Sequence, residues 1–279
     1  MIGLEKGITK EAVRMAWPAV CESFFIALAG MVDSLMVSSM GASAVAAVGL
    51  TTQPKFMGLA LFFAMNVSVS ALVARRRGEK NQRSANQILL VAILFVIVAT
   101  VVISLACVMW ANEIINFCGS APETHEPAVI YYRIIMGCMI FNVLSMVINA
   151  AQRGSGNTMI AMRTNIVSNV VNIIANYLLI QGHLGFPALG IAGAAIATVF
   201  GTVIACIMSF ASLFRRDGFV SIYYIMEQQI RPALEPVISI IKLGFSVFIE
   251  QILMRVGFMS TAMMAAKMGT NALAAHQVV

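Results

Sequence analysis

Long apolar runs dominate this chain and restrict its fold more than any other feature. Two of them, Ile88 to Trp110 and Ala188 to Phe214, contain no charged residue. A bilayer core about 30 Å thick is crossed by roughly 20 apolar residues of α-helix. Only 11% of the residues are charged, too few for the surface of a water-soluble domain. Because the period-2 alternation of a membrane barrel is absent, we expect an all-α, multi-pass membrane protein embedded in a lipid bilayer.

The apolar runs divide the chain into eight candidate spans, the last one incomplete. They cover residues 13–38, 45–74, 88–111, 128–152, 160–181, 188–214, 237–266, and 271 onward. We interpret residues 1–214 as a six-helix bundle and residues 215–237 as a cytoplasmic interfacial linker. Residues 238–279 then begin a second bundle, with span seven and part of span eight.

The positive charges predict the orientation of the chain. Fourteen of the eighteen basic residues fall in the N-terminus and in the second, fourth and sixth loops. Cytoplasmic loops of membrane proteins collect Lys and Arg. We therefore expect a cytoplasmic N-terminus. The membrane that we expect is the plasma membrane of a bacterium, its inner membrane. The same rule explains the basic run from Arg75 to Arg77, so we expect no nucleic-acid partner.

An internal repeat indicates two related bundles. At an offset of 228 residues, Glu22–Leu50 aligns without gaps with Glu250–Val278, and eight of 29 positions are identical. Chance would give about two. Spans one and seven run in the same direction, so the repeat is parallel, an arrangement found in transporters whose halves rock around a midplane site. The chain therefore reads as the front portion of a longer protein, truncated in the second bundle.

Two carboxylates in the first span are the main candidates for cation coupling. Glu22 and Asp33 are eleven residues apart, which places them on nearly the same helix face, separated by about 16 Å. A carboxylate in hydrocarbon is costly unless it has a function or a partner. Burial disfavours its charged form, so Asp33 could bind and release a proton or transiently bind Na⁺. We predict no fixed metal site, because the five cysteines are scattered singly.

Amides and other polar residues are the candidates for the substrate pocket. Asn165, Asn169, Asn172 and Asn176 are spaced 4, 3 and 4 and share one face of the fifth span, and Thr198 lies in the middle of the sixth. Hydrogen bonding between helices explains such a stripe equally well. In span seven, Glu250 is a further coupling candidate, whereas Arg255 fits a substrate contact or a structural ion pair.

Several segments together resemble the multidrug and toxic compound extrusion (MATE) transporters, over essentially the whole chain. The segments are Trp17 to Glu22, Met31 to Asp33, Met40 to Ala42, Ala46 to Leu50, Arg153 to Thr158, Leu189 to Thr198 and Ala274 to Gln277. The resemblance implies a MATE-type fold with a six-helix N-lobe. It also implies export of small organic cations or amphipathic drugs by antiport against H⁺ or Na⁺, by a protein that we expect to be monomeric when full length.

The resemblance also assigns residues. Asp33 matches the first-span aspartate of cation coupling, Asn172 and Thr198 match polar positions of the N-lobe pocket, and we add Asn169, Asn176, His276 and Gln277 as pocket residues. The proton-coupled branch has an aspartate where this chain has Asn176. The sodium-coupled branch has its seventh-span glutamate near Met254, about one turn beyond Glu250.

Three further expectations remain from the sequence. No phosphate-binding loop or nucleophile with its base is present, so we expect neither an enzyme nor a cofactor. One alternative is a flippase for lipid-linked precursors of the same superfamily, which would have a basic central cavity. Another is a truncated fragment that does not transport by itself.

Overall fold

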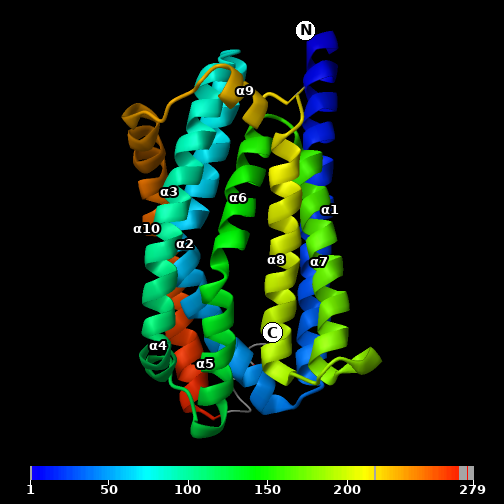
Figure 1. Cartoon of the computed structure of the whole chain (residues 1–279), viewed down its shortest axis with the longest axis vertical. Coiled ribbons are helices and arrows are strands. Elements are labelled where there is room, and N and C mark those ends of the chain that lie inside the picture. Colours follow the sequence, from blue (N-terminus) through cyan, green and yellow to red (C-terminus); the bar gives the residue numbers. More distant parts are fainter. Residues whose placement is uncertain (1, 217, 270–274, 276–279) are drawn as a thin grey trace.

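The computed structural model describes residues 2–216, 218–269 and 275. Its long helices, in chain order, are α1 (Ile2–Ser38), α2 (Ala42–Gly78), α3 (Gln82–Met109), the consecutive pair α5 (Pro122–Gly137) and α6 (Met139–Gly154), α7 (Thr158–Gln181), α8 (Gly190–Leu213) and α10 (Leu234–Lys267). The short elements are α4 (Ala111–Phe117), the 3₁₀ turn η1 (His183–Gly185) and α9 (Ile222–Glu227). The long helices run side by side along the long axis of the molecule (Figure 1).

Among the described residues, five helices are long and apolar enough to cross a membrane, and the α5–α6 pair makes a sixth if it is one broken span. We had expected a single helix over 128–152. The chain instead bends by 47° between α5 and α6, at Cys138, where the backbone leaves helical geometry. Helix α7 has 24 residues but is not among the apolar spans, because its four asparagines lower its mean hydropathy. The predicted eighth span lies almost entirely outside the described residues.

The basic loops gather at one end of the bundle. The start of α1, the α2–α3 turn and α9 lie at the same end in Figure 1, and α4 and the start of α5 lie at the other. At the α2–α3 turn, Arg76 and Arg75 bind Glu79 at 2.8 and 3.0 Å. These hydrogen bonds hold the pKa of Glu79 below its ordinary value, and the bond from Arg76 has the largest effect. The prediction that the basic loops share one side agrees with this arrangement; which side faces the cytoplasm stays a prediction.

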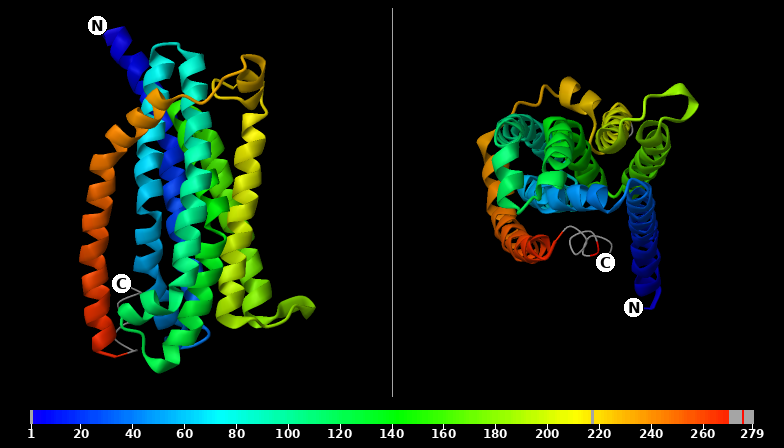
Figure 2. Two further views of the ribbon diagram at one scale, coloured as in Figure 1. Left: turned by 60° about the vertical axis from the view of Figure 1, so that its left-hand side comes forward. Right: turned by 90° about the horizontal axis from the view of Figure 1, so that it is seen from below.

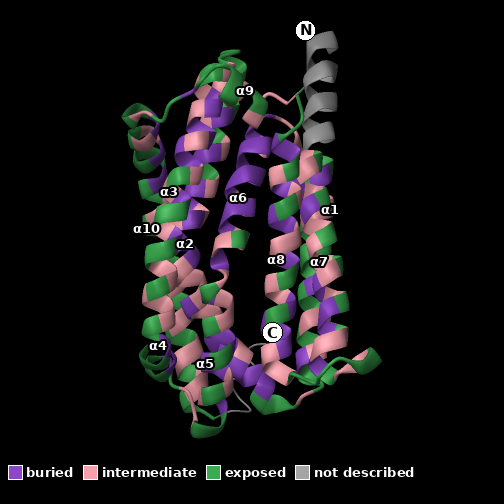
Figure 3. Ribbon diagram, in the orientation of Figure 1, coloured by how far each residue is buried: buried purple, intermediate pink, exposed green. Residues whose placement is uncertain are grey.

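Helix α6 forms the centre of the bundle. Most of its residues are buried, whereas residues 16–38 of α1 and helix α10 are largely exposed (Figure 3). Its polar residues are paired with α8: Ser145 and Ser209 lie 2.9 Å apart, and Gln152 donates to Ser212 at 3.1 Å. Satisfying buried polar groups in this way avoids the cost of leaving them unpaired in hydrocarbon. These bonds fix how α6 and α8 meet.

Helices α1 and α10 form the edges of the molecule. α1 packs mainly along α7, and α10 packs along α2. Seen from below, α1 and α10 stand on either side of α2 (Figure 2). Their exposed side chains are largely apolar, for example Phe24 and Met31 on α1 and Leu253 on α10. Such surfaces suit contact with lipid or with further helices.

The segment between α8 and α10 is tied to the start of α3. The fully buried Asn86 donates to the Phe219 carbonyl oxygen at 2.9 Å and accepts from the Ser221 backbone N–H at 2.8 Å. Helix α10 begins at Leu234, inside the predicted linker 215–237. Pro236 lies in its first turn, where proline is tolerated because those N–H groups have no helical partner.

Removal of the Asn86 side chain should loosen this segment. In Asn86→Ala the Phe219 carbonyl and the Ser221 N–H lose their partners, at a cost of about 1–3 kcal/mol. We expect faster cleavage by trypsin at Arg215 and Arg216 in the detergent-purified protein. Gln87→Ala, which loses a single bond to the Arg231 carbonyl oxygen, is the matched control and should be cleaved much more slowly. Equal cleavage of both variants would contradict this role of Asn86.

Candidate functional site

Asp33 lies among amide groups from the neighbouring helix α7. Asn176 donates to Asp33 Oδ1 at 2.7 Å. Asn172, with its amide oriented to satisfy its neighbours, donates to the same oxygen at 2.9 Å and accepts from the Thr198 backbone N–H at 3.1 Å. Among the described residues, Asp33 forms no ion pair with a basic group. The carboxylate thus accepts hydrogen bonds from neutral amides, and Lys55 acts on it only through space.

A small cavity opens beside this carboxylate. It has a volume of about 70 Å³ and is lined by Asp33, Ser34, Val37, Val45, Val48, Tyr131, Asn176, Ala194 and Thr198. Asn176 Oδ1 is buried and has no hydrogen-bond donor. Carboxylate and amide oxygens are the kind of ligands that hard cations prefer. The space suits an ion or a water molecule.

Close packing of α8 on α7 sets the width of this site. A side chain at Gly201 would lie 2.8 Å from the Ser168 carbonyl oxygen and 3.1 Å from Asn172 Cβ. Glycine therefore permits the two backbones to approach one another here. Ser168 also donates to the Gly201 carbonyl oxygen at 2.8 Å. This contact brings Thr198 of α8 close to Asn172 of α7.

Glu22 occupies a second polar cluster on the same helix. It forms an ion pair with Arg153 of α6 at 3.5 Å and accepts a hydrogen bond from Asn165 of α7. Arg153 also donates to Asn66 of α2 at 3.0 Å. Glu22 thus binds Asn165, and Asp33 binds Asn176. The two carboxylates are eleven residues apart on α1, and the two asparagines are eleven residues apart on α7. The predicted common face of the two carboxylates is therefore the face that packs on α7.

The structure does not bring the other predicted site residues into this cavity. Asn169 does not line it, and its Nδ2 is buried without a partner. Glu250 is exposed on α10. Arg255 of the same helix lies over the Phe56 ring of α2, with its Cζ atom 4.5 Å from the ring centroid. His276 and Gln277 lie outside the described residues. The roles predicted for these residues stay predictions.

Two polar residues of the cavity were missed by sequence reasoning. Tyr131 on α5 lines the cavity, but a tyrosine within a predicted span has no spacing or charge that marks it as a pocket residue. Ser34 follows Asp33 directly and also lines the cavity. Only its place next to the aspartate could have indicated it.

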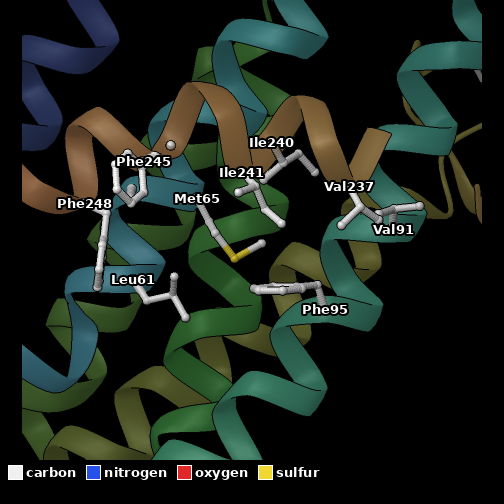
Figure 4. Close-up of a pocket in the computed structure, with 11 residues that line it drawn as sticks. Leu61, Met65, Val91, Phe95, Val237, Ile240, Ile241, Phe245 and Phe248 are labelled. Atoms are coloured by element: carbon white, nitrogen blue, oxygen red, sulfur yellow. The ribbon is translucent and has the colours of Figure 1, made fainter. Parts of the chain in front are cut away.

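A second, wholly apolar cavity of about 90 Å³ lies between α2, α3 and α10. Met65, Phe95 and Ile241 point toward one another across it (Figure 4). Binding sites combine an apolar wall with a few polar groups that orient the ligand. Because this cavity offers no polar side chain, we interpret it as a packing gap where α10 meets the bundle.

Comparison with known proteins shows the family of this chain. The family model described as MatE matches residues 18–178, which is more than half of the chain. The chain therefore belongs to the MatE family of transporters, and the all-helical fold and the MATE resemblance expected from the sequence are confirmed.

Individual relatives are distant but cover nearly all of the chain. "Probable multidrug resistance protein NorM" of Thermotoga maritima is 26% identical over 97% of this chain, and the protein of the same name from Rhizobium meliloti is 28% identical over 88%. The chain spans only 58% and 52% of their lengths.

Solved structures match to the same extent. An outward-facing multidrug resistance MATE family transporter gives a TM-score of 0.82 at 26% identity, over 92% of this chain and 56% of that one. A transporter of the same superfamily from Pyrococcus furiosus, described as having a binding pocket of reverse polarity, gives 0.82 at 26% identity, over 95% and 57%.

Proposed function

We propose that this chain forms the first bundle, and the start of the second, of an antiporter that exports amphipathic organic compounds in exchange for a cation. The single observation that carries the proposal is the Asp33 carboxylate, held by two asparagine amides and without an ion-pair partner among the described residues. A charge in that position is costly unless a cation visits it. If Asp33 binds a cation in one conformation and is without it in the other, entry of the cation would be coupled to export of the compound.

Sodium is the coupling ion that the geometry favours. The amide N–H groups of Asn172 and Asn176 donate to Asp33 and therefore stabilise its ionised form. Asn176 Oδ1 has no hydrogen-bond donor and is therefore the candidate for a second oxygen ligand. A proton would need no such ligand. We infer that Asp33 and Asn176 supply ligands to Na⁺.

The driving force is sufficient for export. One monovalent cation that enters down 100 mV releases about 2.3 kcal/mol. This free energy sustains roughly a 50-fold gradient of a neutral compound. A concentration gradient of the ion adds to that figure.

Efflux under separate ion gradients tests this proposal. The protein, expressed from its complete reading frame, is placed in vesicles loaded with ethidium, a cationic amphipathic dye. We expect an imposed Na⁺ gradient to drive efflux and a pH gradient of equal size to drive much less. An ionophore that collapses the Na⁺ gradient is the control. Efflux driven by the pH gradient alone would contradict sodium coupling, and efflux independent of both would contradict antiport.

The alternative of a lipid-linked precursor flippase has one observation in its favour. Lys55 of α2 and Arg255 of α10 both lie against the Phe56 ring, so basic residues are present as well as the acidic Asp33. The transporter from Pyrococcus furiosus is described as having a binding pocket of reverse polarity that suggests a different function. Transport of a substrate with an anionic headgroup is therefore the second candidate function.

A further inference from the structure

Lys55 is a half-buried basic residue of α2 whose charge is not used by any contact described so far. Its Nζ atom lies 5.2 Å from the centroid of the neighbouring Phe56 ring. The ion pairs among the described residues involve other basic groups, those of Arg75, Arg76 and Arg153. The face of an aromatic ring attracts a cation only weakly. In the part of the chain that the structure describes, no anion in direct contact therefore neutralises Lys55.

The anion that acts on Lys55 is the Asp33 carboxylate. Each of the two groups is an electrostatic neighbour of the other, although they form no ion pair in direct contact. The Asp33 carboxylate accepts hydrogen bonds from Asn172 and Asn176 instead. Asp33 thus has neutral donors in contact and a positive charge at a greater distance.

The position of Lys55 on α2 agrees with this interaction. Val48 of α2 lines the Asp33 cavity, whereas Lys55 does not. Lys55 follows Val48 by seven residues, which is about two helical turns, so both lie on nearly the same face of α2. The other charged residues of this helix, Arg75 to Arg77, lie at its far end. Lys55 is therefore the charge of α2 that can influence the cavity.

A positive charge near a carboxylate lowers the affinity of that carboxylate for another cation. The Lys55 ammonium and an Na⁺ at Asp33 would repel one another, more strongly than in water. Across several ångströms of protein this repulsion changes the affinity about tenfold. An ion site in a membrane must bind well enough to fill and weakly enough to empty. The charge of Lys55 favours emptying.

We propose that Lys55 is a built-in competitor of the coupling cation at Asp33. Its charge weakens the binding of Na⁺ there, so that the ion leaves the site fast enough for repeated transport. Lys55 acts through Asp33 and does not contact the ion. The proposal rests on the proposed function, because it concerns the same carboxylate, and it adds the residue that sets the affinity of the ion site.

Equilibrium binding of radioactive Na⁺ to the purified protein, expressed from its complete reading frame, tests the proposal. We expect Lys55→Met to bind Na⁺ about tenfold more tightly than the unaltered protein. In vesicles, the same variant should reach half-maximal efflux at a lower Na⁺ concentration, and its maximal rate should fall because the ion is released slowly. Equal Na⁺ affinity in the unaltered protein and Lys55→Met would overturn the proposal.

Two control variants separate charge from shape. Lys55→Arg keeps the positive charge, so its Na⁺ affinity should stay close to that of the unaltered protein. Lys242→Met removes an exposed cation from α10 and should leave the affinity unchanged. If Lys55→Arg binds Na⁺ as tightly as Lys55→Met, the charge of Lys55 does not set the affinity, and the proposal is overturned.

The reactivity of Lys55 gives a test that needs neither a Lys55 variant nor transport. Only the uncharged amine reacts with acetic anhydride, and the Asp33 carboxylate stabilises the charged form. At one fixed pH, mass spectrometry should therefore find faster acetylation of Lys55 in Asp33→Asn than in the unaltered protein, with Lys242 as the internal reference. Equal rates would overturn the proposal.

Addition of Na⁺ to the same reaction separates this proposal from the antiport proposal. At constant ionic strength, Na⁺ should speed acetylation of Lys55 in the unaltered protein and have no effect in Asp33→Asn. Faster acetylation in Asp33→Asn without any effect of Na⁺ would support the action of Lys55 on Asp33 and contradict sodium as the ion. The two failures are therefore distinguishable.

Discussion

Replacement of Asp33 by asparagine is expected to abolish ion-driven efflux while the protein still folds. The substitution keeps the size of the side chain and removes the only charge in the cavity formed by described residues. A neutral amide cannot attract Na⁺ as a carboxylate does, so the coupled ion is lost. The dye gradient that the imposed Na⁺ gradient sustains in the unaltered protein should therefore fall to equality. The measurement is ethidium efflux from vesicles under an imposed Na⁺ gradient.

A neighbouring substitution separates loss of charge from general damage. Ser34 lines the same cavity directly after Asp33, and Ser34→Ala should retain most of the efflux. Folded yield after size-exclusion chromatography should be similar for both variants. Full efflux in Asp33→Asn, with unchanged dependence on the ion, would show that this carboxylate does not couple the two fluxes.

Removal of Arg153 is expected to cause the largest loss of stability. The side chains of Glu22 and Arg153 are 13% and 26% exposed. Arg153→Met leaves the Glu22 carboxylate with Asn165 alone and breaks the bond to Asn66. An uncompensated, largely buried charge typically costs several kcal/mol. With allowance for partial exposure, we expect a loss of about 2–3 kcal/mol, measured as a lower thermal midpoint in detergent.

A double substitution tests whether the pair itself is responsible. In Glu22→Gln/Arg153→Met no charge remains unpaired, so at least half of the lost stability should return. Arg163→Met, at an exposed position of α7, is the control and should change stability little. If the double variant is at least as unstable as Arg153→Met, Glu22 and Arg153 do not act together.

The pairing of Glu22 distinguishes it from Asp33. Both were predicted as coupling residues from their common face on one helix. A carboxylate with a fixed cation as neighbour exchanges ions less readily than one surrounded by neutral amides. Arg153 is 131 residues from Glu22, and nothing in local spacing indicates that the fold would join them. The coupling role of Glu22 therefore stays a prediction that the same efflux assay can test.

The helical bundle could be predicted well because long apolar runs are a direct physical signal. The spacing of the asparagines also predicted that Asn165, Asn172 and Asn176 would share a face, and all three meet a neighbouring helix. The bend at Cys138 could not be predicted, since no proline marks it. Likewise, the approach of Arg255 to Phe56 depends on how α10 packs on α2, which no local pattern specifies.

Equilibrium binding of radioactive Na⁺ to the purified protein, expressed from its complete reading frame, measures the exchange at Asp33 most directly. The unaltered protein should bind one Na⁺ that excess ethidium displaces, and Asp33→Asn should bind none at the same concentration. Undiminished Na⁺ binding by Asp33→Asn, or binding of Na⁺ and ethidium together without competition, would contradict the exchange of cation for substrate.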